Sequence, residues 1–375
     1  DDAESDTITT HFEYHCMEDN LLKLDMLGHD DPTMIKMLED LTGVNARAIP
    51  LDDPDTMSIF TSSKVLGFEN DEVLGPTGAV AIPEFNTRFT RGMLMDTMPK
   101  DFNTLVRLSG FSHGTDVWLG NARELIVSGT ASVLQTVGCR DDIMLYLISM
   151  GLDPKMSFKI MEAVRKGKVK KGGFQEGWEE AMREHEVPDW YIGSLAKIGY
   201  LFPKAHAVAY VMMAFRIAWF KVHEPLAFYA TFFSIRAKAF DAEYCCAGLD
   251  AVKQKIKEIE NNKDATDVEQ NLMVTLEVCY EFYLRGFHFD TIDIYKSDAT
   301  RFKITENGLL PPFVTVRGLG ETAALDTVEK RKGKTFISVE EFANTCSKLS
   351  KTHIEQLKAL GAFAGMADTS QVSLF

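Results

Sequence analysis

Short amphipathic helices dominate the sequence from Pro32 onward and limit the fold more than any other feature. Between Met34 and Leu41 the apolar residues recur at helical spacing and fall on one face. Glycine and proline turns separate such segments, so each helix is short and must bury its apolar face against a neighbour. Similar patterns predict helices near residues 56–61, 88–97, 101–109, 120–127, 141–150, 154–165, 177–186, 207–236 and 250–262.

Strand-like segments flank the helical region. Residues 7–28 look rich in β structure and end in a short predicted strand at Leu21–Met26. We predict a mainly α, multidomain fold with a partial β segment at the start and a small α+β region after the helices. Further strand-like segments lie at residues 287–294, 301–304 and 313–316. The expected domains are residues 1–32, 33–240 and 241–366, followed by a C-terminal tail at 367–375.

The formal net charge of −15 at pH 7 argues at first against a nucleic-acid partner, because phosphate contacts need lysine and arginine. The charges are unevenly distributed, however. Residues 165–171 (RKGKVKK) hold five cations and no acid, whereas acidic runs lie at residues 1–6 and 52–55. A local basic site for phosphate is therefore compatible with an acidic chain.

The cysteines and the apolar stretches indicate a cytoplasmic protein. The six cysteines show no C-x-x-C pairing and no histidines at zinc spacing, so we expect reduced structural thiols. The most apolar stretch, residues 207–215, is nine residues long. A bilayer span needs roughly 20 residues, so no membrane contact is expected. The sequence begins at Asp1 without an initiator Met, and we expect it to start partway through a larger protein.

Asp25 is a carboxylate inside the predicted strand at Leu21–Met26. Period-two alternation places it on the same face as Lys23, opposite Leu24. By pattern alone such a residue is either a solvated edge residue or a metal ligand. A pair of metal ions needs several carboxylates, and no D-x-D pair precedes Asp25 in this sequence.

The sequence contains a series of motifs in a fixed order. They are LLKLDMLGHDDP (21–32), IPEFNTR (82–88), LSGFSHGTDVWLGNA (108–122), GCRDDIM (138–144), KIMEAVRKGK (159–168), VPDWY (187–191), FPKAHAVAY (202–210) and RGLG (317–320). Together these motifs resemble the PolC branch of the bacterial family C DNA polymerases over essentially all 375 residues.

This resemblance implies template-directed addition of dNMP from dNTP by a two-metal mechanism. It makes Asp25 the third catalytic carboxylate and a ligand of two Mg²⁺ ions, and it places Lys23 near the primer terminus or the triphosphate. The D-x-D pair of that family lies upstream, in a part that this sequence does not contain.

A basic cluster of Arg165, Lys166 and Lys168 follows the predicted helix at 154–165. Such clusters are often solvated helix ends that interact with the helix dipole. The alternative is a triphosphate site, where cations neutralise the charge that develops on the leaving pyrophosphate. The resemblance favours this nucleotide-binding role, in the fingers domain, and adds Arg140 as a further candidate.

Lys204, His206 and Tyr210 form K-x-H-x-x-x-Y, which places His206 and Tyr210 one turn apart on a helix face. Taken alone, a histidine there is more often a packing residue. The resemblance implies that this face borders the incoming nucleotide, with Tyr210 against sugar or base and Lys204 near phosphate. The aromatic residues that follow are better explained as core than as a base-stacking platform. They are Phe215, Trp219, Phe220, Phe228 and Phe232.

The segment from Ser109 through Gly110 and His113 to Gly114 is interpreted as a small-residue loop between helices. Such a loop lets backbone N–H groups approach phosphate or base pairs, although a plain turn fits the pattern equally well. The resemblance favours a DNA-binding surface near the nascent base pair. Arg88 and Arg91 would belong to the same surface.

Two features near the C-terminus indicate binding partners. Gly318, Leu319 and Gly320 fit the hairpin of a helix-hairpin-helix, which would bind duplex DNA through free helix N–H groups, although a packing turn is the alternative. The last five residues resemble the motif by which bacterial polymerases bind the sliding clamp. The clamp-binding residues would be Gln371, Ser373, Leu374 and Phe375.

Two functions follow from these observations. The first is a replicative DNA polymerase whose partners are primer–template DNA, dNTP, the sliding clamp and other replisome subunits at the nucleoid. The second is a non-catalytic module that binds DNA and the sliding clamp. The absent D-x-D pair separates them, because Asp25 alone cannot hold two Mg²⁺ ions, and we therefore expect little activity from these 375 residues by themselves.

Overall fold

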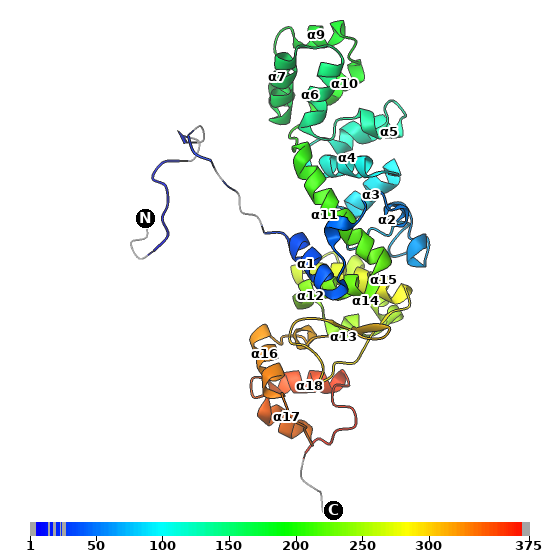
Figure 1. The fold of residues 1–375 in the computed structure, drawn as a ribbon, viewed down its shortest axis with the longest axis vertical. Coiled ribbons are helices and arrows are strands. Elements are labelled where there is room, and N and C mark those ends of the chain that lie inside the picture. The colour runs from blue at the N-terminus through cyan, green and yellow to red at the C-terminus, as the bar shows by residue number, and fades with distance from the viewer. Residues whose placement is uncertain (1–4, 14–15, 18–19, 23, 25–27, 370–375) are drawn as a thin grey trace, which may run out of the picture. The chain divides into compact units, whose positions relative to one another are not determined.

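The computed structural model describes residues 5–13, 16–17, 20–22, 24 and 28–369 (Figure 1). The chain divides into two compact units, Asp1–Asp30 and Asp31–Phe375. The described residues between 5 and 29 form no strand, so the expected β-rich start is not found among them. The strand predicted at Leu21–Met26 lies partly outside the described residues and stays a prediction.

The second unit begins with a series of short helices, as the sequence predicts. Helix α3 (Arg88–Thr97) and helix α7 (Pro154–Arg165) have the predicted bounds. The short helices α8 (Lys168–Gly172) and α10 (Asp189–Lys197) were not predicted. The remaining helices of this part are α1 (Asp30–Thr42), α2 (Pro54–Ser58), α4 (Phe102–His113), α5 (Arg123–Val127), α6 (Arg140–Ser149) and α9 (Trp178–Glu184) (Figure 1).

Aspartate caps fix where several of these helices begin. Asp53, Asp101 and Asp153 each accept a hydrogen bond from the backbone N–H three residues further on, at 2.9, 2.8 and 2.8 Å. The helices that follow are α2, α4 and α7. Proline occupies the first position of α2 and α7, where no backbone N–H is needed.

The helix predicted at residues 207–236 is in fact two helices, α11 (Lys204–His223) and α12 (Pro225–Ile235). The single-helix prediction is wrong because Pro225 has no N–H to continue the ladder and forces Glu224 out of the helical region, at φ −131°. Among the described helices, α11 alone is long and apolar enough to suit a membrane span. Its packing against α4 and α12 in the core explains that composition (Figure 1).

Of the five aromatic residues predicted to be core, the four phenylalanines are buried and Trp219 is partly buried against the core. Phe215, Phe220 and Phe228 are fully buried, and Phe215 packs edge-on against Phe102 of α4 with ring centroids 6.2 Å apart. This packing holds the first turn of α4 against the middle of α11. The two helices together form the support for the site described below.

The rest of the second unit contains a small mixed sheet. Strand β3 (Gly308–Leu310) lies between β1 (His288–Phe289), to which it is parallel, and β2 (Lys303–Ile304), to which it is antiparallel. The strand predicted at 313–316 is wrong, because Phe313–Thr315 forms a turn of 3₁₀-helix after Pro312. The helices here are α13 (Ala242–Cys245), α14 (Leu249–Asn261), α15 (Asp267–Leu284), α16 (Glu321–Lys330), α17 (Val339–Thr345) and α18 (Lys351–Ala359).

Candidate functional site

An extended segment, residues 199–203, connects the ends of four helices. The N–H of Gly199 donates to Thr115 O at 2.9 Å, just beyond α4. The N–H of Leu201 donates to Arg165 O at 3.3 Å, at the end of α7. Phe202 O accepts from the N–H of Arg140 at 3.1 Å, at the start of α6, and α11 begins directly after Pro203. We call residues 199–203 the connecting segment.

The connecting segment brings together the cations that the sequence assigns to nucleotide binding. Arg165 and Arg140 hydrogen-bond to it through their backbones, and Lys204 follows it directly. Lys166 and Lys168 flank Gly167, whose φ of +66° and close approach to Gly199 O leave no room for a Cβ. The predicted cations therefore share one region of the fold, although they come from three separate parts of the sequence.

An acidic residue accompanies the cations at the end of α7. Arg165 donates to Glu162 Oε2 at 2.9 Å, and the Lys166 ammonium lies 3.4 Å from the same oxygen. The hydrogen bond from Arg165 lowers the pKa of Glu162. Lys168 is exposed at the start of α8. The cluster thus keeps a net positive charge and remains accessible to an anion.

The N-terminus of α11 is capped from another helix. The backbone N–H of Lys204 donates to Asp141 Oδ2 at 2.7 Å, and Asp141 lies in the first turn of α6. This carboxylate occupies the end of α11 that would otherwise attract an anion. Any phosphate contact at this point must therefore come from the Lys204 side chain.

Aromatic rings line the first turns of α11. The ring centroids of His206 and Tyr210 are 4.5 Å apart, which confirms that the two residues share a face. His206 also packs against Phe202 of the connecting segment at 5.1 Å and against His113 of α4 edge-on at 5.6 Å. The structure therefore brings His113, predicted to bind DNA, beside His206, predicted to bind the nucleotide.

Glu84 was missed in the sequence analysis, although it lies within the IPEFNTR motif. Its Oε2 accepts a hydrogen bond from Ser109 Oγ at 2.9 Å and one from His113 Nε2 at 2.6 Å. Burial would raise the pKa of Glu84, but the hydrogen bond and charge of His113 outweigh burial and lower it. The same hydrogen bond raises the pKa of His113 against the opposing effect of burial. Both shifts favour an ion pair between the two side chains.

The interpretation of residues 109–114 as a loop is wrong, because Ser109 to His113 form the last turns of α4. Ser109 is fully buried, and Gly110 packs so closely on the backbone of Gly138 that a Cβ would overlap the Gly138 carbonyl oxygen. These glycines serve close helix packing, and the backbone N–H groups of this turn are used within the helix. The DNA-binding role predicted for Ser109 and Gly110 stays a prediction. Because both residues are buried, they could act on DNA only through other residues.

Arg88 and Arg91 lie apart from the histidines, facing α14 and α15. Arg91 is buried and donates to Leu74 O at 3.3 Å and to Glu277 Oε2 at 3.2 Å. Arg88 is more exposed and pairs with Glu260 and, at 3.7 Å, with Glu277. Arg91 thus serves packing, whereas Arg88 could reach a ligand only by leaving its acidic partners.

The hairpin predicted around Gly318 is present. Gly318 has a φ of +76°, which only glycine adopts readily, and Gly320 precedes α16 as its N-cap. Leu319 is buried between them and does not face solvent. Arg317 pairs with Asp241 at 2.8 Å and Glu243 at 2.9 Å. The geometry suits phosphate contact through the backbone at the start of α16 rather than through Arg317.

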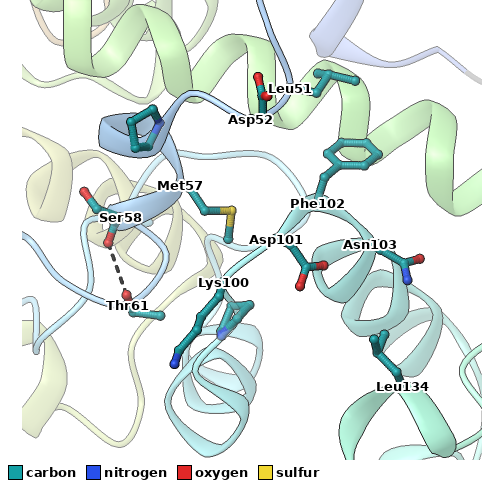
Figure 2. Close-up of a pocket in the computed structure, with 12 residues that line it drawn as sticks. Leu51, Asp52, Met57, Ser58, Thr61, Lys100, Asp101, Phe102, Asn103 and Leu134 are labelled. Carbon is teal, nitrogen blue, oxygen red and sulfur yellow. Dashed lines mark hydrogen bonds between the residues drawn. The ribbon is translucent and has the colours of Figure 1, made fainter.

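A hollow lies at the opposite end of α4 from His113. It has a volume of about 840 Å³ and is lined by α2, by the turn before α4 and by the first residues of α4 (Figure 2). Phe102 and Met57 give it an apolar wall, and Lys100 and Asp101 line it with opposite charges. None of the residues predicted to bind nucleotide or DNA lines this hollow.

Part of the predicted chemistry lies outside the described residues. Asp25, Lys23 and the clamp-binding residues 371–375 are not described. Within the described ranges no group of three or more histidine, cysteine or acidic side chains could hold a metal ion. The described part of the chain therefore does not supply a site for the two expected Mg²⁺ ions.

Two family models match this chain. Residues 31–186, which include α4 to α9 and most of the predicted cations, match the bacterial DNA polymerase III alpha subunit finger domain. Residues 286–372, which include the Gly318 hairpin, match a helix-hairpin-helix motif. Over these residues the chain is similar to the finger domain of bacterial DNA polymerase III alpha subunits and to a helix-hairpin-helix motif.

The chain is also similar along its whole length to proteins named DNA polymerase III PolC-type. It is 54% identical over 376 residues to the protein of Caldanaerobacter subterraneus subsp. tengcongensis and 50% identical over 376 residues to that of Halalkalibacterium halodurans. It is 50% identical over 380 residues to that of Streptococcus mutans serotype c. Each match includes 100% of this chain but 26% of the relative, so the chain spans about a quarter of their length.

Proposed function

We propose that this chain contributes the end of the palm, the fingers and the duplex- and clamp-binding region of a replicative DNA polymerase of the PolC type. The whole protein would add dNMP from dNTP to a primer on a DNA template. The observation that carries the proposal is the convergence of Arg140, Arg165 and Lys204 on the connecting segment, beside His206 and Tyr210. The similarity to PolC-type proteins supports the same assignment.

The residues of this site have complementary tasks. The cations would neutralise the triphosphate and the charge that develops on the leaving pyrophosphate. The ring of Tyr210 would pack against the sugar or base, and the Lys204 side chain would contact phosphate. These contacts bind and orient the nucleotide, and orientation alone can contribute substantially to the rate.

Metal chemistry would depend mainly on residues beyond this chain. Mg²⁺ ions in such an enzyme activate the attacking hydroxyl and stabilise the leaving group. Asp25 would supply one carboxylate and Lys23 a nearby positive charge. An upstream carboxylate pair, as the resemblance implies, would complete the site.

Two further regions would hold the DNA and the replisome. The hairpin at Gly318 would contact duplex DNA behind the active site, in keeping with the helix-hairpin-helix match. The last five residues would bind the sliding clamp, and the protein would work in the cytoplasm at the nucleoid. A non-catalytic DNA- and clamp-binding module would use the same two regions but would need no triphosphate site. The clustered cations therefore favour the polymerase.

The substitution Asp25→Asn in the full-length protein tests this proposal. It removes a metal ligand but no DNA contact, so nucleotide incorporation should fall by several orders of magnitude while primer–template affinity persists. Single-nucleotide extension and a DNA-binding titration would measure the two effects. Near-normal turnover in this variant would overturn the palm assignment.

A further inference from the structure

The backbone at Glu84 has a strained conformation. Its backbone has a φ of +69°, and Ala81, three residues earlier, has a φ of +63°. Residues other than glycine adopt this region rarely, and such strain persists only where surrounding contacts hold it. The side chain of Glu84 is 11% exposed. Placing a largely buried carboxylate on a strained turn costs free energy, which the hydrogen bonds from its partners must offset.

The turn that carries Glu84 is anchored at its other end by a buried lysine. The Lys221 ammonium, on α11, donates to Gly78 O at 2.7 Å and to Val80 O at 2.6 Å. The N–H of Ala81 donates to the side-chain oxygen of Asn86 at 2.6 Å and closes the turn. These contacts fix residues 78–86 against α11, so the Glu84 carboxylate has little freedom to move.

We infer that Glu84 is a positioning residue of the nucleotide site, which holds His113 against His206 and thereby fixes the face of α11 that meets the incoming nucleotide. The inference rests on the proposed function. It extends that function to a residue that makes no contact with the substrate and acts through the hydrogen bond to His113.

The charged and titratable groups around this contact come from three elements. Glu84 lies on the turn, Ser109 and His113 lie on α4, and His206 and Tyr210 lie on α11. The charge of His206 also lowers the pKa of Glu84, so the carboxylate faces both histidines. With His113 cationic, the pair presents an imidazolium beside the nucleotide-facing histidine. Without Glu84, His113 would lose its orientation, and its pKa would fall because burial would act unopposed.

The pH dependence of the site follows from the directions of the two pKa shifts. The pKa of His113 is raised and that of Glu84 is lowered. Both partners are charged at a pH above the lowered pKa of Glu84 and below the raised pKa of His113. The ion pair is lost as the pH rises through the pKa of His113. The Michaelis constant for dNTP should rise over the same pH range.

The test uses the full-length protein with a primer–template and a single dNTP between pH 6 and 9. Glu84→Gln keeps the shape but removes the charge. It should raise the Michaelis constant at neutral pH by about tenfold, with a smaller change in the turnover number, because the hydrogen bond to His113 loses the charge that strengthens it. The pH at which the Michaelis constant rises should move lower. Glu84→Asp keeps the negative charge, and aspartate tolerates a positive φ, so this variant should have a Michaelis constant between those of the unaltered protein and Glu84→Gln.

A second carboxylate–histidine pair provides the matched control. Asp53 Oδ2 lies 2.9 Å from His223 Nε2 at the far end of α11, and Asp53→Asn preserves the cap of α2 because asparagine caps equally well. This variant should leave the pH profile unchanged. A shifted profile in Glu84→Gln alone supports the inference. An unchanged profile in Glu84→Gln, or an equal shift in the control, overturns it, whereas absence of incorporation by the unaltered protein overturns the proposed function as well.

Discussion

The ammonium of Lys221 lies 2.7 Å from Glu281 Oε1, and both side chains are completely buried. Glu281 also accepts a hydrogen bond from Tyr229 at 2.6 Å, so α11, α12 and α15 meet at one carboxylate. Burial lowers the pKa of Lys221 to about 8, against the opposing effect of Glu281. Because Lys221 also holds residues 78 and 80, this pair connects the protein core to the turn that carries Glu84.

Removing one member of this pair should be strongly destabilising. Lys221→Met or Glu281→Gln leaves an unpaired polar group in the core, and each should lower the free energy of unfolding by about 3–5 kcal/mol. The double variant should lose less than the sum, because no unpaired charge remains. Urea unfolding monitored by tryptophan fluorescence would measure this. Asp40→Asn, which breaks the exposed pair with Lys36, should leave the midpoint unchanged, and equal effects at both pairs would contradict the argument.

Two helical glycines should respond in opposite ways to alanine. A Cβ on Gly110 would overlap the Gly138 carbonyl, so Gly110→Ala should destabilise the protein by about 1–3 kcal/mol through forced separation of α4 from the start of α6. Gly92, within α3, has open space around its Cα, so Gly92→Ala should stabilise by about 0.5–1 kcal/mol through helix propensity. Thermal unfolding of both variants would decide whether the close approach at Gly110 exists.

The sequence predicted the helices that local signals define. Residues 154–165 were placed correctly because Asp153 and Pro154 mark the start of α7. The single helix at 207–236 failed because apolar periodicity was followed through Pro225. The small residues at 109–114 were interpreted as a loop, whereas Gly110 serves helix packing within α4. Local pattern therefore fails where a small residue or proline has a tertiary role.

The sequence allowed candidate site residues to be named one by one, but it did not predict how they are arranged in the fold. The basic cluster at Arg165 and the histidine at 206 stand out in the sequence. Their convergence depends on backbone hydrogen bonds to residues 199–203, which no spacing rule encodes. Glu84 was not predicted as a site residue because its hydrogen-bond partners lie 25 and 29 residues away in the sequence and its backbone conformation is unusual. Its place in the IPEFNTR motif was the available signal.

Substitutions in the triphosphate region and in the Gly318 hairpin should impair different steps, nucleotide incorporation and DNA binding respectively. Lys166→Ala or Lys204→Ala should raise the Michaelis constant for dNTP or lower the turnover number, because each removes a cation from the triphosphate region. Gly318→Val should instead weaken primer–template affinity in a salt-dependent way, because its φ of +76° strains a β-branched residue and distorts the hairpin. Gly320→Val should have a smaller effect, because Gly320 has an ordinary φ and open space at its Cα. Similar behaviour of the lysine and glycine variants would refute the separation into two binding regions.

The five terminal residues can be tested separately from the fold. The described backbone is held as far as Asp368, because the N–H of Val339 donates to Ala367 O at 2.9 Å and the N–H of Glu340 donates to Asp368 O at 3.1 Å. Lys358 also pairs with Asp368. Deleting residues 371–375 should therefore leave this contact and the stability of the protein unchanged.

Deletion should nevertheless abolish clamp-stimulated synthesis. Leu374 and Phe375 would enter an apolar groove on the clamp, with Gln371 making a polar contact at its rim. So short a segment binds weakly by itself, with a Kd on the order of micromolar. Binding of the same polymerase to DNA raises the local concentration of the segment and converts weak affinity into processivity. Titration of a bacterial sliding clamp into intact and truncated protein would measure the difference, with clamp-independent DNA binding as the control. Equal clamp affinity in the two proteins would show that these residues do not bind the clamp.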